Sequence, residues 1–123
     1  MSQISIQAPP GTGVIVTAPT VHTPSGTTVT IDWDDGYFQI IDAGSASGNI
    51  TVTLSNPVDG APYELWFIQG ATARTLTLPS TVKFSEGRTP AQSSANNARD
   101  RMGGFYSSTE GVYCWNYSPG HNA

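Results

Sequence analysis

The sequence predicts an all-β protein: an antiparallel β-sandwich or jelly-roll-like fold with an extended N-terminal arm. Short segments of alternating apolar and polar residues recur along the chain, turn-forming residues separate them every ~8–12 residues, and no segment has helical periodicity. A chain of 123 residues has room for one domain. We place the arm at residues 1–25 and a single β-sandwich domain of roughly eight strands at residues 26–123.

The arm differs in composition from the rest of the chain. The first 31 residues contain no charged residue and no Phe, Tyr or Trp, and prolines interrupt their strand-like fragments. An uncharged apolar segment needs a cover, since its exposed backbone otherwise invites aggregation. It is an edge strand of its own domain, an arm that docks on a neighbouring subunit, or a free tail. Its apolar residues are candidate capsid- or subunit-binding residues: Ile4, Ile6, Val14, Ile15 and Val16.

The domain is expected to open with a hairpin. Residues 26–31 form a Thr-rich alternating strand, residues 32–36 an acidic turn, and residues 37–42 the partner strand. The acidic residues do not have the spacing of a calcium-binding loop, so they are interpreted as a solvated turn, with an adventitious cation site as the alternative: Asp32, Asp34, Asp35 and Asp42.

The central strands follow. Residues 48–55 alternate strictly, which predicts a half-buried strand with Ile50, Val52 and Leu54 on its buried face. Residues 63–69 are apolar on both faces, as is typical of a central strand that lies between layers or is covered by a partner. Trp66 in this strand is predicted to be a core residue. Further short strands are expected around Leu76 with Leu78, and around Val82 with Phe84.

The C-terminal part contains a long loop and a hairpin. Residues 85–101 are irregular and carry three of the five basic residues, and loops of this length are usually functional or mobile. Residues 104–117 predict a hairpin with three aromatic residues on one face. That face is an inner sheet face, a subunit interface or a ligand platform. With Trp33, which we expect to be exposed in its acidic turn, these residues are the candidate interface or sugar-stacking aromatics: Trp33, Tyr113, Trp115 and Tyr117.

Composition argues against several functions. The net charge of −4 and the five basic residues disfavour nucleic acid and anionic membranes as partners. The single cysteine, Cys114, excludes an intramolecular disulfide and is expected in the core, and no Cys or His cluster predicts a metal site. His22 and His121 lie in the arm and at the C-terminal end, which are poor platforms for a general base. We therefore expect no catalytic residue, no metal and no cofactor, and expect synthesis in the cytoplasm because no signal peptide is recognisable.

Several runs carry a resemblance to a known group of proteins. They are short β-structural signatures within residues 26–117, about three quarters of the chain: GTTVTID (26–32), ITVTLSNPVDG (50–60), YELWFIQG (63–70), RTLTLP (74–79), Val82, and EGVY (110–113). In these runs the chain resembles small β-rich virion proteins and appendage domains of tailed bacteriophages.

The resemblance implies a non-enzymatic, often trimeric protein that decorates the head or belongs to a tail fibre or tailspike. The chain lacks a triple-stranded shaft and a long attachment domain, so we expect a capsid decoration (cement) protein first, located in the virion and assembled in the host cytoplasm. Its partners would be the major capsid protein and copies of itself, and the resemblance implies a homotrimer. The alternative is a carbohydrate-binding receptor module of a tail fibre or tail tip, and the third reading is a minor tail or baseplate component without a ligand.

Overall fold

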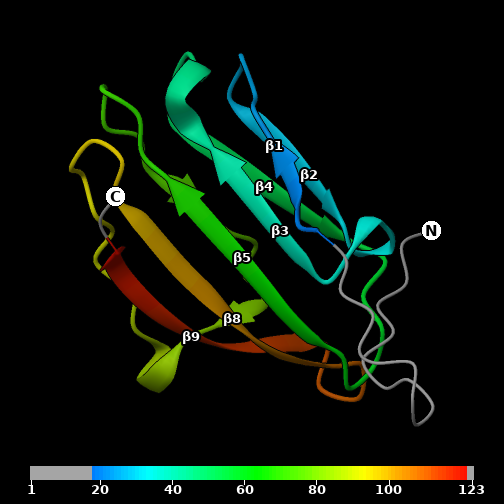
Figure 1. Ribbon diagram of the computed structural model, residues 1–123. Coiled ribbons are helices and arrows are strands. Elements are labelled where there is room, and N and C mark those ends of the chain that lie inside the picture. Colours follow the sequence, from blue (N-terminus) through cyan, green and yellow to red (C-terminus); the bar gives the residue numbers. More distant parts are fainter. Residues whose placement is uncertain (1–17, 122–123) are drawn as a thin grey trace, which may run out of the picture.

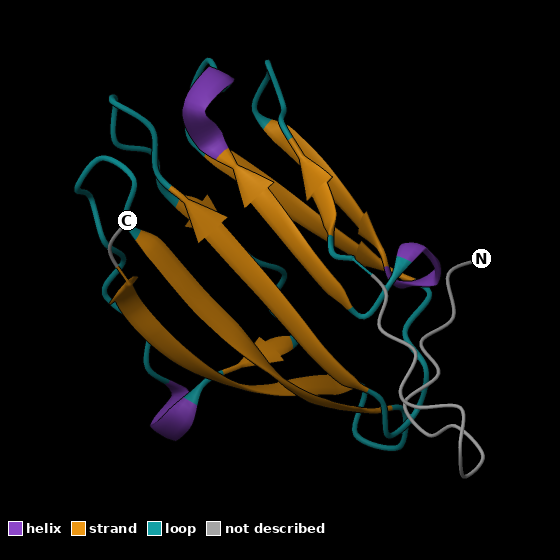
Figure 2. Ribbon diagram, in the orientation of Figure 1, coloured by secondary structure: helices purple, strands orange, loops and turns teal. Residues whose placement is uncertain are grey.

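The computed structural model describes residues 18–121, which form two β-sheets and three short 3-10 turns (Figures 1 and 2). The larger sheet has six strands in the order β1-β3-β5-β8-β9-β7, and the smaller has three in the order β2-β4-β6. This confirms the all-β class. The strands are β1 (Thr20–His22), β2 (Thr28–Asp32), β3 (Phe38–Asp42), β4 (Ile50–Ser55), β5 (Pro62–Ile68), β6 (Leu76–Thr77), β7 (Val82–Lys83), β8 (Arg99–Ser107) and β9 (Val112–His121), and the 3-10 turns are η1 (Trp33–Asp35), η2 (Ala43–Ser45) and η3 (Ser85–Gly87).

The first six strands alternate between the two sheets. Strands β1, β3 and β5 run parallel to one another in the larger sheet, and β2, β4 and β6 run parallel in the smaller one. The chain therefore winds as a coil whose successive turns stack side by side. Only β5–β8 and β8–β9 pair antiparallel, while β7–β9 is again parallel. The predicted antiparallel arrangement is thus wrong, because the smaller sheet is parallel throughout and the larger sheet is mixed.

The first corner of this coil shows why the expected hairpin at residues 26–42 does not form. The Asp32 carboxylate accepts a hydrogen bond from the backbone N–H of Asp34 at 2.9 Å and caps η1. The chain therefore turns a corner from one sheet into the other instead of folding back. Buried Gln39 holds the corner, since its Nε2 donates to the carbonyl oxygens of Asp32 at 2.7 Å and Gly36 at 2.9 Å.

The second corner is also formed by an aspartate that caps a 3-10 turn. Asp42 accepts from the backbone N–H of Gly44 at 2.9 Å and caps η2, which leads the chain from β3 towards β4. In both corners the residue after the aspartate is buried, Trp33 in the first and Ala43 in the second. An aspartate followed by a core residue therefore marks each corner.

Other predicted elements are confirmed. In β4, Ile50 and Val52 are buried and Leu54 is partly buried against the core, while the intervening threonines are exposed. Strands β8 and β9 form the predicted C-terminal hairpin, with Gly104 opposite Trp115 and Tyr106 opposite Tyr113. Both segments alternate with period two, which places alternate side chains on the same face of the sheet.

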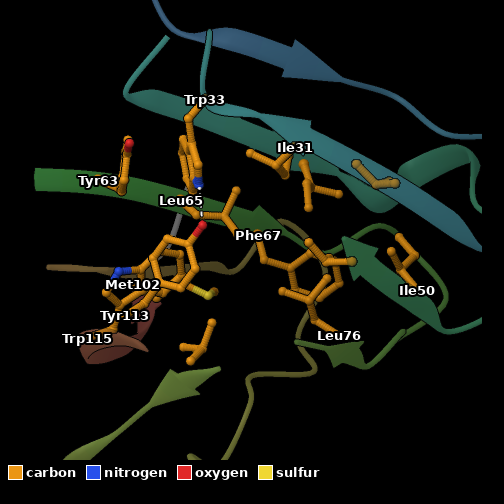
Figure 3. Close-up of a cluster of buried hydrophobic side chains, with 14 of the residues drawn as sticks. Ile31, Trp33, Ile50, Tyr63, Leu65, Phe67, Leu76, Met102, Tyr113 and Trp115 are labelled. Atoms are coloured by element: carbon orange, nitrogen blue, oxygen red, sulfur yellow. Dashed lines mark hydrogen bonds between the residues drawn. The ribbon is translucent and has the colours of Figure 1, made fainter. Parts of the chain in front are cut away.

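The core lies between the two sheets (Figure 3). At one end it is aromatic, with Trp33 stacked on Tyr63 at a centroid distance of 4.0 Å. At the other end aliphatic side chains meet Phe67. The residues labelled in the close-up come from both sheets and from η1: Ile31, Trp33, Ile50, Tyr63, Leu65, Phe67, Leu76, Met102, Tyr113 and Trp115.

A glycine in β8 allows the hairpin to close. Gly104 has φ +154°, and a Cβ there would lie 2.2 Å from the carbonyl oxygen of Cys114. We expect Gly104→Ala to lower the free energy of unfolding by about 2–4 kcal/mol through backbone strain and overpacking. Gly26→Ala is the matched control, because a Cβ there meets nothing within 4 Å and should change stability by less than ~0.5 kcal/mol. Urea titration of both variants checks this, and equal midpoints would contradict it.

Candidate functional site

The predicted arm lies largely outside the described residues. This holds for all of its candidate binding residues, Ile4, Ile6, Val14, Ile15 and Val16. Only the end of the range assigned to the arm is described, and there Thr20–His22 forms β1 at the edge of the six-stranded sheet. Strand β1 pairs with β3, and the His22 ring nitrogen Nε2 lies 2.7 Å from Gln39 Oε1.

The predicted exposure of Trp33 is wrong. Its side chain is 0% exposed, and its Nε1 donates to the Tyr113 hydroxyl at 3.1 Å. Tyr113 and Trp115 are buried on the inner sheet face, as the first of the three interpretations predicted. Burial raises the pKa of Tyr63 to about 12 and also raises that of Tyr113, so both phenols stay neutral near pH 7. These buried rings leave no face for a sugar.

Tyr117 is half-buried and serves as a structural anchor. Its hydroxyl donates to the carboxylate of Asp100, which also accepts from the backbone N–H groups of Ser93 and Gly120, each at 2.9 Å. Burial raises the pKa of Asp100, but these hydrogen bonds outweigh it and the net pKa lies below the ordinary value. Burial, then the hydrogen bond to Asp100 and its charge, raise the pKa of Tyr117. The pair joins β8, β9 and the loop that precedes them.

That loop covers residues 88–98 and is held by buried or half-buried polar side chains. Gln69 donates to the carbonyl oxygens of Arg74 and Ser93. Gln92 Oε1 accepts from the N–H of Leu76 at 2.7 Å, and Gln92 Nε2 donates to the carbonyl oxygen of Leu76 at 2.8 Å. The Gln92 side chain thus takes the place of a neighbouring strand at the free edge of β6. The loop therefore connects the two sheets through hydrogen bonds, a role that the sequence did not predict.

The acidic residues do not converge on a site. Within residues 18–121, no group of three or more His, Cys, Asp and Glu side chains is placed to hold a metal ion. Asp32 bonds Asn56 Nδ2 at 2.9 Å, and this bond together with the N–H of Asp34 lowers its pKa. Asp42 caps the second corner, while Asp34 and Asp35 are exposed.

A groove of about 510 Å³ lies between β6, β7 and the start of the 88–98 loop. The Phe84 and Tyr117 rings meet edge to face there at 5.8 Å, and Lys83 and Arg88 stand at its rim. Its lining contains no Asp, Glu, His or Cys.

The most distinctive surface is the side of the six-stranded sheet that faces away from the core, here called the outer face. Apolar side chains cross it in register, with Val21 opposite Ile40 and Ile40 opposite Trp66. Val21 is 55% exposed and Phe105 63% exposed. The apolar residues of the outer face are Val21, Phe38, Ile40, Trp66, Ile68 and Phe105, and its charged residues are Asp42, Glu64, Lys83, Arg99 and Arg101.

Trp66 forms the centre of the outer face, so the prediction that it lies in the core is wrong. Its indole Nε1 donates to Glu64 Oε2 at 2.6 Å, and the same carboxylate binds Arg101 Nε at 2.8 Å. The Arg101 guanidinium lies 5.5 Å from the centroid of the Trp66 ring, and the Phe38 ring lies 5.1 Å from it on the side of β3. The indole is thus fixed from both neighbouring strands, and this pre-organised cluster has the composition of an interface hot spot.

The outer face also contains Cys114, which is exposed. The prediction of a core position is wrong because Tyr113 and Trp115 face inward, so the residue between them faces outward. A hollow of about 250 Å³ is lined by Glu64, Arg101, Met102, Gly103, Asn116 and Ser118. Two of these residues, Glu64 and Arg101, contact Trp66.

Sequence reasoning offered a covering partner as one of two interpretations of residues 63–69 but placed Trp66 in the core. Strand β5 is apolar on both faces, and a strand covered on both sides needs a second layer or a partner. The smaller sheet packs against one side only, which leaves Trp66 and Ile68 on the other.

In comparisons with protein families, curated proteins and solved structures, nothing matches this chain. In the described part of the chain, no helix is long and apolar enough to cross a membrane.

Proposed function

We propose that this protein is a non-enzymatic structural protein of a tailed-phage virion, and that it decorates the capsid as an oligomer. The observation that carries the proposal is the outer face, where Trp66, Phe38 and Arg101 form a fixed cluster among exposed apolar residues. Aromatic residues and Arg are enriched at the centres of protein interfaces. The phage-like runs of the sequence and the uncharged N-terminal segment support the same function.

In this proposal the β-domain, here called the β-body, associates with copies of itself as a trimer, and the arm binds the major capsid protein. Residues 18–121 form two β-sheets, and β1, which follows the arm in the sequence, lies at the edge of the six-stranded sheet. Several arms on one oligomer bind the coat lattice together, which raises the apparent affinity far above that of one arm. Binding only to the assembled head then stabilises the head by mass action.

Removing residues 2–17 tests the role of the arm. In this variant Met1 is followed directly by Ala18, and all of β1 is retained. We therefore expect an unchanged β-sheet spectrum by circular dichroism. We expect it to lose binding to expanded heads in a co-sedimentation assay, because the bivalent or trivalent attachment is gone. Full-length protein is the control, and undiminished binding of the truncated variant would overturn the role of the arm.

A receptor-binding module of a tail fibre or tail tip is the second candidate. The hollow beside Trp66 favours it, since Glu64, Arg101, Asn116 and Ser118 offer hydrogen-bonding groups next to an aromatic ring. The buried Trp33, Tyr113 and Trp115 are no longer candidates for sugar stacking. A glycan array separates the two functions: decoration predicts no bound glycan, and a receptor module predicts binding that Asn116→Ala weakens.

A further inference from the structure

The charges of this protein are divided unevenly between two surfaces. The outer face carries two acidic and three basic residues, a formal charge of +1, although the whole chain has a net charge of −4. The remaining seven acidic and two basic residues give the rest of the chain a formal charge of −5. A second copy is therefore repelled by most of the surface, but the outer face does not repel it.

The acidic excess is concentrated at one end of the molecule, here called the acid end. It consists of η1 with its flanking residues, the loop before β5 and the β8–β9 turn, which Figure 1 shows at the same end. Hydrogen bonds join them: Asp32 accepts from Asn56, and Asp59 accepts from the N–H of Ser108 at 2.8 Å. The segments 32–36, 56–61 and 107–111 contain no Lys or Arg and five acidic residues, Asp32, Asp34, Asp35, Asp59 and Glu110.

We infer that the outer face of one copy binds the acid end of a second copy, in a head-to-tail contact centred on Trp66 and Arg101. Trp66 and Phe105 supply apolar area, and Arg101, Arg99 and Lys83 face the carboxylates of the neighbour. Two outer faces, each with a formal charge of +1, would gain no such net attraction. A contact between two different patches closes into a ring when its rotation allows. The inference rests on the oligomer that the proposed function requires.

Changing the charge of each surface tests this contact. Arg101→Glu changes the outer face, and the double variant Asp34→Lys/Asp35→Lys changes the acid end; all three side chains are exposed. We expect each variant alone to associate at least ~10-fold more weakly than wild type in light scattering after size exclusion. We expect the equimolar mixture to regain part of the association, because the carboxylate that Arg101→Glu introduces on one copy can then meet the ammonium groups that Asp34→Lys/Asp35→Lys introduce on its neighbour. Arg88→Glu, exposed and paired only with Glu86, is the control with the same charge change as Arg101→Glu and should associate like wild type.

Cys114 gives a second readout of the contact. It is the single cysteine and lies on the outer face, opposite Phe105 in the β8–β9 register. A thiol reagent should label it slowly in concentrated wild-type protein and faster in Arg101→Glu.

Three results would overturn the inference: wild type that is monomeric at all attainable concentrations, an acid-end variant that associates normally, or a mixture that regains nothing. None of these measurements involves a phage head. A failure of head binding alone would therefore overturn the proposed function and leave the self-association established.

Discussion

Trp33→Ala is expected to lower the free energy of unfolding by about 3–5 kcal/mol, enough to unfold a large fraction of a marginally stable domain. Trp33 is 0% exposed and stacks on Tyr63, so truncation leaves a cavity where the two sheets meet at the aromatic end of the core. It also removes the hydrogen-bond partner of the Tyr113 hydroxyl. Urea unfolding followed by circular dichroism measures the loss.

Trp66→Ala is the matched control for this prediction. It removes the same side chain from the outer face, where the indole contacts Phe38 and Arg101 rather than the core. We expect a loss of no more than about 1.5 kcal/mol in stability together with weaker self-association. If Trp66→Ala destabilises the fold as much as Trp33→Ala does, the assignment of the two tryptophans to face and core is wrong.

Asp100→Ala is expected to lower the free energy of unfolding by about 3–5 kcal/mol, because it leaves three hydrogen-bond donors without the buried carboxylate that now accepts from them. These donors are the Tyr117 hydroxyl and the N–H groups of Ser93 and Gly120, and Asp100 itself is 1% exposed. The loop at residues 88–98 would lose its attachment to β8 and β9. Asp35→Ala, at an exposed side chain, should change stability by less than ~0.5 kcal/mol.

The same carboxylate predicts a pH dependence. The pKa of Asp100 is lower in the folded protein than the ordinary value of 3.8, so its charged form stabilises the fold. This contribution is fully present above the unfolded-state pKa and is lost as the pH falls through the lowered folded-state pKa. Urea midpoints of wild type should therefore drop below pH 3.8, and those of Asp100→Ala should drop less. Parallel curves for the two proteins would contradict this role.

The sequence predicted burial within strands better than it predicted strand direction. In β4, period-two alternation identified the buried side chains correctly, and in β9 it placed Tyr113 and Trp115 on one face, although Cys114 between them was wrongly expected in the core. Alternation contains no information on whether neighbouring strands run parallel, however, and that was decided at the corners. Asp32 caps a 3-10 turn through the N–H of Asp34, and an acidic turn of this kind looks like a hairpin loop in the sequence.

The candidate site was predicted less well, for a related reason. Flanking acidic residues suggested that Trp33 is exposed, but the corner directs its side chain inward between the sheets. Apolar neighbours suggested that Trp66 is buried, but its place between inward-facing Leu65 and Phe67 puts it on the outer face. Local polarity was therefore misleading at both tryptophans. The pairing of β5 with β3 and β8, which brings Phe38 and Arg101 to Trp66, depends on contacts distant in sequence.

The most direct test of the proposed function is to mix purified protein with expanded phage heads that lack it, sediment the heads and count the bound copies per capsid. Decoration predicts saturation at a number set by the icosahedral symmetry of the head, in multiples of the oligomer. No binding, or binding that never saturates, would contradict the account and favour a role in the tail.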